Sequence, residues 1–477
     1  MIEDGKRLTH NYLFSLAAQA CQLLGPMITM PYVSRVLGVE NIGLYSASAA
    51  MAAYFILAAN FGSSVYGQKR IAAQGIEERS GIFWSVVTFR SVPFVGALLS
   101  WIIYVLCSQE TYRPLLCVQG IAILSVFLDV TWLFQGLQDF RSTALRTVIS
   151  RILGVMAVFL LVKNNQDTVK YVAIEMSCVA LGNLSLWLKL PGLVHRPKAK
   201  EIHPLDCMKE SFQFFIPGLA VQAYTALDKV LLNIIGSNLV ENGYYEQATK
   251  IVRFITSVLT VYSTVWFPRM AALFSGDKKE TKEKARSEIQ QGTQFVSFLG
   301  IPLIVALELT APFLVHFYLG DGFAKCAILI RIMAPNILVI GISTALGQQF
   351  FNPSGRQNIS TGFVFAGALV SCVINLLLIV RLASVGTAIA SMLTELVITI
   401  LFVVYTERKG YFRVIDFLKG SRKHILASVL MGVVVYLMPK SSLIGLAATA
   451  AVGIAVYLAA LWLMKDEQLQ GFYRSLV

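Results

Sequence analysis

Three charged side chains stand at helical spacing inside one apolar stretch of the sequence. Glu246, Lys250 and Arg253 are separated by four and three residues, so they share one face of an α-helix. Glu246 and Lys250 can form an ion pair on that face, which leaves the Arg253 guanidinium to line a wet, positively charged cavity. Two cations about one helical turn apart could bind a phosphate group through charge-assisted hydrogen bonds.

Other charged residues also interrupt apolar stretches. Asp228 and Lys229 are adjacent, so they point about 100° apart on a helix and cannot both face lipid cheaply. Arg146 and Arg151 either line a cavity or extend their long side chains to the membrane surface. Glu395 either serves a cavity or packs between helices as a neutral carboxyl. The candidates for substrate binding are Lys250, Arg253, Lys229, Arg90, Arg146, Arg151 and Arg35, and those for coupling or charge balance are Asp228, Glu246, Asp129 and Glu395.

The composition indicates which elements hold these side chains. Of the 477 residues, 56% are hydrophobic and 14% are charged, whereas soluble domains carry roughly 25% charged residues. Because about 20 apolar helical residues cross a bilayer, we predict an all-α polytopic membrane protein with about 14 transmembrane helices. The expected spans are 11–33, 41–62, 82–106, 114–137, 143–162, 169–189, 211–235, 243–267, 293–317, 326–350, 358–380, 385–405, 424–438 and 442–463.

The formal net charge of +13 is explained by topology, since cytoplasmic loops collect Lys and Arg. With both termini in the cytoplasm, the loops on that side hold most of these residues. The longest polar interruptions are 190–210, 268–292 and 406–423, too short for a nucleic-acid-binding or catalytic domain. We expect residues 275–291 to form a helix on the membrane surface. The seven cysteines and five histidines show no metal-binding spacing, which predicts no metal site.

Two segments about 200 residues apart are similar. Residues 39–45 and 240–245 both begin Val-Glu-Asn, and Gly43 and Tyr45 correspond to Gly243 and Tyr245. The shift is six spans, so the two halves would keep one orientation in the membrane. The predicted organisation is a six-helix lobe at 1–189, a cytoplasmic linker at 190–210, a six-helix lobe at 211–405, a cytoplasmic loop at 406–423, and two further helices with a tail at 424–477. We expect Asp228, Lys229, Lys250 and Arg253 to line a cavity between the lobes.

Eight short stretches, in order along residues 8–410, resemble one family of membrane transporters. They are PYVSRVLG at 31–38, GLY at 43–45, WLFQG at 132–136, FIP at 215–217, LDK at 227–229, GYYEQA at 243–248, WFP at 266–268 and VGTAIA at 385–390. These stretches are similar to those of the bacterial Wzx-type polysaccharide-unit flippases. That family belongs to the multidrug/oligosaccharidyl-lipid/polysaccharide exporter superfamily, whose members include the multidrug exporters.

The resemblance implies a two-lobed bundle that moves an undecaprenyl-pyrophosphate-linked oligosaccharide from the cytoplasmic to the outer leaflet of the bacterial inner membrane. It implies alternating access with no cofactor and coupling to Na⁺ or H⁺. The implied partners are the lipid-linked substrate, membrane lipids, and the polymerase and chain-length regulator of the same pathway, but no nucleic acid. Under this reading Lys250 and Arg253 would contact the pyrophosphate.

Alternative functions remain open at this stage. A flippase for teichoic-acid or other lipid precursors and a cation-coupled drug exporter would share the fold. A membrane-embedded polymerase or glycosyltransferase is disfavoured because no large extracytoplasmic loop or catalytic carboxylate cluster is present. An ATP-driven transporter is disfavoured because the sequence lacks a phosphate-binding GxxxxGK[ST] motif. We therefore expect a transporter and not an enzyme.

Overall fold

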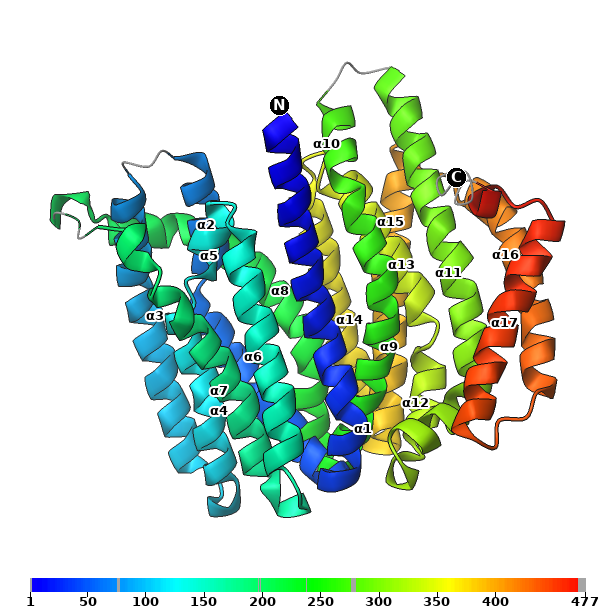
Figure 1. Ribbon diagram of the computed structural model, residues 1–477, viewed down its shortest axis with the longest axis horizontal. Helices are drawn as coiled ribbons and strands as arrows, with labels where there is room; N and C mark the ends of the chain where they lie inside the picture. Colours follow the sequence, from blue (N-terminus) through cyan, green and yellow to red (C-terminus); the bar gives the residue numbers. More distant parts are fainter. Residues whose placement is uncertain are drawn as a thin grey trace. The chain divides into compact units, whose positions relative to one another are not determined.

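The computed structural model describes residues 2–74, 78–195, 197, 199–236, 238–275 and 280–470, and within these ranges it contains helices and no β-strand. The chain divides into two compact units, residues 1–230 and 231–477. Each unit is a bundle of helices that run roughly parallel or antiparallel to one another (Figure 1). The all-helical fold class is thus confirmed.

Eight helices build the first unit. They are α1 (Ile2–Asn60), α2 (Ser63–Ala73), α3 (Arg79–Cys107), α4 (Arg113–Leu128), α5 (Thr131–Gly136), α6 (Phe140–Leu161), α7 (Thr168–Trp187) and the first part of α8 (Pro204–Gly236). The long helix α1 is broken at Gly38, whose φ of 77° lies in the region that favours glycine. Its two arms match the first two expected spans. Helix α1 packs against α3, α4 and α6, and α7 packs against α4 and α6.

The boundary between the compact units lies inside α8, later than the linker expected at 190–210. The first part of α8 belongs with the first unit because it packs against the end of α1. The Ser211 hydroxyl donates a hydrogen bond to the Phe61 carbonyl at 2.8 Å. The Phe61 and Phe215 rings stack with centroids 5.0 Å apart.

The second unit holds the rest of the chain. After the end of α8 come α9 (Leu239–Val265), α10 (Phe267–Phe274), α11 (Glu280–Tyr318), α12 (Cys326–Met333), α13 (Asn336–Leu346), a π-helix (Gly347–Phe351), α14 (Gln357–Leu382), α15 (Ser384–Arg408), α16 (Val414–Leu437) and α17 (Leu443–Leu463). The last two helices pack on each other, and α16 lies along α11. Figure 1 shows this pair as the orange and red helices.

The two units repeat one order of elements. In the first unit a long arm of α1 is followed by short α2, long α3, the broken pair α4 and α5, and then α6 and α7. In the second unit α9 is followed by short α10, long α11, the broken pair α12 and α13, and then α14 and α15. The packing repeats as well, since α4 lies against α7 as α13 lies against α15, and α6 against α7 as α14 against α15. The fold therefore carries the internal repeat that the sequence similarity predicted.

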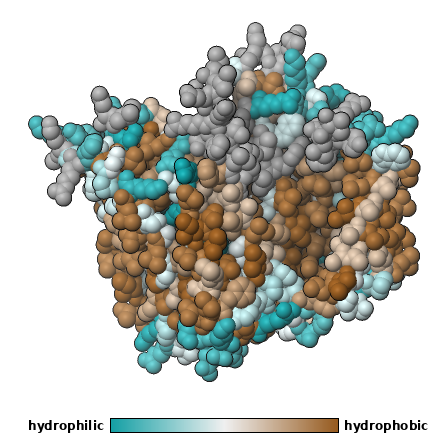
Figure 2. Space-filling view, viewed as in Figure 1, coloured by the Kyte–Doolittle hydropathy of each residue, from teal (hydrophilic) through white to brown (hydrophobic). Residues whose placement is uncertain are grey.

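Apolar side chains cover the middle of the helices, and hydrophilic side chains gather at their two ends (Figure 2). Among the described residues, nine helices are long and apolar enough to cross a membrane, and the bent pair α12 and α13 gives a tenth span. The expected fourteen would be reached if the second arm of α1, α8, α9 and α16 also cross the membrane. The chain is a polytopic membrane protein, and fourteen crossings remain a prediction consistent with its helices.

Two expected boundaries differ from the structure. The segment 275–291 was expected to form a separate surface helix, but α11 starts at Glu280 and continues without a break to Tyr318; residues 276–279 lie outside the described part. Acidic and basic residues three or four positions apart can stabilise a helix, so the mixed charges of this segment are compatible with the first turns of a long helix. Helix α16 begins at Val414, ten residues before the expected start of that span. The first turns of α16 contain several charged residues, so they do not form an apolar run and were not predicted as part of the span.

Candidate functional site

The break between α4 and α5 shapes the polar interior of the first unit. Helix α4 ends at Leu128, and α5 starts at Thr131. The Asp129 carboxylate accepts a hydrogen bond from the Thr131 backbone N–H at 2.9 Å, and so caps the start of α5 as an N-terminal carboxylate does. A chain break of this kind frees backbone groups inside a membrane protein, and those groups need partners.

Arg90 supplies partners for that break. Its Nη1 donates to the carbonyl of Asp129 at 2.7 Å and to that of Val126 at 3.1 Å. Its Nε donates to the Ser63 hydroxyl at 2.7 Å, which ties α3 to the start of α2. The side chain is 1% exposed and lies over the Trp132 ring. Arg90 was a candidate for substrate binding, but these contacts make it a residue that positions the helices around the cavity.

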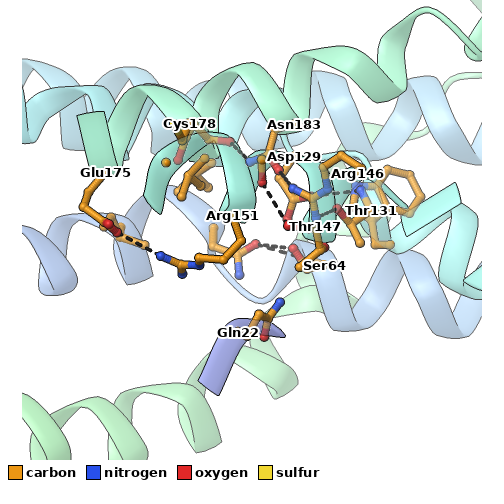
Figure 3. Close-up of a pocket in the computed structure, with 18 of the residues that line it drawn as sticks. Gln22, Ser64, Asp129, Thr131, Arg146, Thr147, Arg151, Glu175, Cys178 and Asn183 are labelled. Carbon is orange, nitrogen blue, oxygen red and sulfur yellow. Dashed lines mark hydrogen bonds and ion pairs between the residues drawn. The ribbon is translucent and has the colours of Figure 1, made fainter. Parts of the chain in front are cut away.

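Beside this break lies a cavity of about 680 Å³ within the first unit. Figure 3 shows its polar wall, which α6 and α7 provide on one side and the α4–α5 break on another, with Gln22 of α1 facing them. Its polar and charged lining residues are Gln22, Asn60, Ser64, Ser125, Asp129, Thr131, Gln135, Arg146, Thr147, Ser150, Arg151, Glu175 and Asn183. Three of the expected site residues, Asp129, Arg146 and Arg151, thus meet in one cavity.

Arg146 is held by uncharged groups. Its Nη1 donates a short hydrogen bond to the Asn183 side-chain carbonyl, and its Nη2 donates to the Thr131 hydroxyl at 3.2 Å. Asn183 is fixed in turn, because its amide donates to the Ser125 carbonyl at 2.9 Å. These bonds use two of the five guanidinium N–H groups. Arg146 is therefore oriented by its neighbours without an ion pair to a carboxylate in the described part of the chain.

Arg151 lies about one and a half turns further along α6 and has a charged partner. Its Nη1 is 3.0 Å from Oε2 of Glu175 on α7. The side chains of Arg151 and Glu175 are 24% and 16% exposed, and Figure 3 shows the ion pair between them. With Arg146 and Asp129, the lining holds two arginines and two carboxylates. The buried cation of Arg90 directly behind the wall gives the region a net positive charge.

Two glycines leave room for the arginine side chains. A Cβ atom at Gly25 of α1 would lie 2.6 Å from Cγ of Arg151, and one at Gly182 of α7 would lie 3.1 Å from Cδ of Arg146. The helix backbones at these positions pack directly against the aliphatic parts of the arginines. Glycine is therefore required for close approach at Gly25.

The substitution Gly25→Ala should lower the stability of the protein in detergent by about 1–3 kcal/mol, because the new methyl group overlaps Arg151, which Glu175 holds in place. The matched control is Gly96→Ala in α3, where a Cβ would meet nothing within 4 Å. We expect that control to be neutral or slightly stabilising, as alanine favours helices. Thermal unfolding of both variants measures the difference, and equal midpoints would contradict the close packing.

The charged face of α9 lies in the second unit. Nζ of Lys250 is 3.0 Å from Oε1 of Glu246, whose side chain is 6% exposed. The ion pair that the spacing allowed is therefore present, and it compensates the Lys250 charge. Arg253 is exposed, and no ion pair joins it to another residue of the described part.

The remaining expected site residues have separate environments. Asp228 is buried on α8 and Lys229 is half-buried beside it. Glu395 is buried on α15 at 6% exposed. Arg35 is exposed on α1. None of the four lines the cavity of the first unit.

Sequence reasoning selected none of the uncharged polar residues of the lining, nor Glu175. Asn183 and Thr131 are uncharged, and no spacing rule marks them before the helices are placed. Glu175 was not among the candidate residues, since the pairing of α6 with α7 is not visible in the sequence. No group of three or more His, Cys, Asp or Glu side chains that could hold a metal ion occurs in the described ranges.

Comparisons with known proteins give the family of this chain. A family model described as "Polysaccharide biosynthesis protein" matches residues 8–274, which is more than half of the chain. The chain belongs to the polysaccharide biosynthesis protein family. This membership supports the resemblance to Wzx-type flippases.

Two relatives of this chain carry the name "Putative O-antigen transporter". The one from Escherichia coli (strain K12) is 22% identical over 84% of this chain and 97% of its own length. The one from Shigella dysenteriae is 24% identical over 82% of this chain and 98% of its own length. Both cover the two units of the chain.

Solved structures show the same fold. The lipid II flippase MurJ in its inward closed conformation superposes with a TM-score of 0.77 at 17% identity, covering 98% of this chain and 99% of MurJ. An outward-facing multidrug resistance transporter of the MATE family gives a TM-score of 0.57 at 12% identity, covering 85% of this chain and 95% of the other. Both structures thus share the fold of this chain.

Proposed function

We propose that this protein flips undecaprenyl-pyrophosphate-linked oligosaccharide units from the cytoplasmic to the outer leaflet, where they serve cell-surface polysaccharide synthesis. Three lines of argument support the proposal: the family membership, the names of the relatives, and the fold shared with a lipid flippase. The observation that carries it in this chain is the arginine-lined cavity inside the first unit.

The cavity suits an anionic, hydroxyl-rich substrate. A pyrophosphate that leaves water for a membrane interior needs compensation, because an uncompensated anion there is very costly. Arg146 keeps free N–H groups that can bind phosphate oxygens as a two-pronged donor. The amide and hydroxyl side chains of Gln22, Gln135 and Ser150 in the lining can exchange hydrogen bonds with sugar hydroxyls.

We propose Arg146 and Arg151 as the first contacts of the pyrophosphate. Lys250 and Arg253 remain a second proposed pair for the same group. The Lys250 charge is already compensated by Glu246 at 3.0 Å, so Arg253 would contribute most of the attraction there. Because only Arg253 of this second pair lacks a counterion in the described part, the second pair would bind the pyrophosphate more weakly than two uncompensated cations would. Weaker binding there would favour release of the substrate.

The proposal includes a location and partners. The protein would act in the bacterial inner membrane with both termini in the cytoplasm, as the Lys and Arg content of its loops indicates; the side chains of the first residues and all of residues 471–477 lie outside the described part. The polymerase and chain-length regulator of the pathway would receive its product. Na⁺ or H⁺ coupling would drive alternating access.

Deletion of the gene in its own host tests the function. We expect loss of surface polysaccharide and accumulation of lipid-linked units that an impermeant glycosidase cannot reach in intact cells. A plasmid copy should restore both measurements. If surface polysaccharide is unchanged and the strain instead becomes sensitive to cationic drugs, the drug-exporter alternative replaces the proposal. If another lipid precursor accumulates instead, the flippase acts on that precursor.

A further inference from the structure

One face of α16 is left uncovered in the described part of the chain. The opposite face is buried against α11 and α17, and Figure 1 shows the α16–α17 pair at the edge of the second unit. The uncovered side chains recur every three or four residues and so form one stripe along the helix. This α16 stripe begins with the exposed residues Ile415, Leu418, Lys419, Arg422, Ile425, Leu426 and Val429. Exposed apolar surface of this kind in a membrane protein meets lipid.

Two cations interrupt the apolar part of the α16 stripe. Lys419 and Arg422 are three residues apart, so they are neighbours on the helix surface. Ile415 and Leu418 come before them and Ile425 comes after them, and all three are exposed. A cation with apolar neighbours on both sides is typical of a helix at the boundary between acyl chains and headgroups, where long basic side chains reach the phosphates.

The negative charges near the start of α16 are engaged elsewhere. Oδ2 of Asp416 is 2.9 Å from Nη2 of Arg286 on α11. The Glu407 carboxylate at the end of α15 accepts a hydrogen bond from the Val414 backbone N–H at 3.1 Å. Neither cation of the stripe forms an ion pair with a carboxylate in the described ranges. The stripe therefore carries a positive charge that a ligand could compensate.

Three further cations lie where α15 ends and α16 begins. Arg408, Lys409 and Arg413 are all exposed, and together with the two cations of the stripe they make a cluster of five. Clusters of about four to eight Lys or Arg residues beside a transmembrane helix are typical of binding sites for anionic lipid headgroups.

The other end of α16 provides a contrast. Lys440 lies just beyond that end and is 8% exposed. Its Nζ donates hydrogen bonds to the carbonyls of Tyr436 and Met438 at 3.2 and 2.9 Å. The ammonium group is thus satisfied within the protein, whereas the cations at the start of α16 are exposed. We therefore expect attraction of anions at the start of the helix and not at Lys440.

Contacts with α11 and with the residues after α17 hold this part of α16 in place. The Ser297 hydroxyl of α11 and Nδ1 of His424 are 2.7 Å apart and share a hydrogen bond. Nζ of Lys423 donates to the Lys465 carbonyl, just beyond α17, at 3.0 Å. Because these contacts fix the helix before a ligand arrives, little conformational entropy of the backbone is lost when one binds.

We propose that the start of α16 binds the headgroup of an anionic phospholipid. Lys419 and Arg422 donate charge-assisted hydrogen bonds to the phosphate oxygens, and the acyl chains lie against apolar side chains of the stripe such as Ile425 and Leu426. A headgroup with a net negative charge, as in phosphatidylglycerol, gains an attraction that zwitterionic phosphatidylcholine lacks. A lipid fits this face better than a protein or a nucleic acid does, because apolar side chains flank the cations on both sides.

Lipid retention by the purified protein tests this site. Native mass spectrometry of the protein in a neutral detergent measures the affinity for the first lipid bound as phosphatidylglycerol or phosphatidylcholine is added. We expect the intact protein to bind phosphatidylglycerol more tightly than phosphatidylcholine. In the double variant Lys419→Gln/Arg422→Gln the affinity for phosphatidylglycerol should fall about 30-fold, the effect of two cations at the strength typical of Lys and Arg beside anionic lipids. Its affinity for phosphatidylcholine should change little.

The matched control is Arg141→Gln/Lys209→Gln, which removes the same charge from two exposed cations of the first unit. It should bind phosphatidylglycerol as the parent protein does. The exchange Lys419→Arg/Arg422→Lys keeps both charges and should keep most of the affinity. Soluble sn-glycerol 3-phosphate, which has the phosphate but no acyl chains, should not displace the lipid at equal concentration.

Unchanged affinity for phosphatidylglycerol in Lys419→Gln/Arg422→Gln would overturn the inference, and so would an equal loss in the control variant, which would mean a diffuse positive surface. Displacement by glycerol 3-phosphate would assign the site to a free phosphate instead of a lipid. Equal affinity of the intact protein for the two lipids would also contradict the proposal, and this comparison needs no variant to fold. The assay requires no lipid-linked oligosaccharide, so its result is independent of the proposed function.

Discussion

Replacement of Arg146 by alanine is expected to reduce surface polysaccharide about 10- to 100-fold, because a charge-assisted hydrogen bond to phosphate contributes roughly 1.5–3 kcal/mol. Arg146 is held by Asn183 and Thr131 and keeps donor groups for a ligand. The substitution removes one of the two cations of the lining and leaves Arg151 with two carboxylates, Asp129 and Glu175. Arg146→Lys should retain part of the activity, since lysine keeps the charge but not the planar two-pronged donor.

The matched control is Arg141→Ala, on the same helix α6 but exposed and outside the cavity. It should export normal amounts of polysaccharide. Membrane levels of every variant must be equal on immunoblots for the comparison to count. Normal export by Arg146→Ala at normal membrane levels would contradict the assignment of the anion to this cavity.

The second large effect is expected at Arg90 and concerns folding. The side chain is 1% exposed, and its guanidinium bonds the ends of α2 and α4. Arg90→Ala would leave the Asp129 and Val126 carbonyls without this donor inside the bundle. Each buried acceptor that loses its hydrogen-bond donor typically costs about 1–3 kcal/mol. We expect little folded protein in the membrane, and a lowered unfolding midpoint for whatever is recovered in detergent.

Arg90→Lys separates charge from geometry at this position. A lysine keeps the positive charge but cannot reach the two helix ends and the Ser63 hydroxyl together, so we expect an intermediate stability. Half-buried Arg79 at the start of α3 provides a comparison on the same helix, and Arg79→Ala should fold normally. Wild-type stability of Arg90→Ala would show that the break between α4 and α5 does not depend on this side chain.

The helices could be predicted because long apolar runs are a one-dimensional signal. Each expected span coincides with a helix or with a broken pair, and the break at Gly38 was placed within a few residues. The signal fails where a helix carries many charges. That is why the start of α11 was expected as a separate surface helix and why the first turns of α16 were missed.

The candidate site was less predictable because it depends on contacts between helices. Asp129, Arg146 and Arg151 were selected as costly charges in apolar stretches, and the structure brings these three into one cavity. Their partners Asn183 and Glu175 come from α7, whose pairing with α6 no local pattern encodes. Arg90 was selected for the same reason as Arg146, yet its buried contacts give it a different role.

Transport of a defined substrate by the purified protein tests the central claim most directly. The protein would be reconstituted into liposomes with an undecaprenyl-pyrophosphate oligosaccharide that carries a fluorophore on its sugar, and an impermeant reductant would bleach only the outer leaflet. We predict that the intact protein moves inner-leaflet substrate outward and bleaches nearly all fluorescence, that Arg141→Ala does the same, and that Arg146→Ala is slowed towards the rate of protein-free liposomes. Bleaching that stops at about half with the intact protein, as in protein-free liposomes, would contradict the account, and so would equal rates for the intact protein and Arg146→Ala.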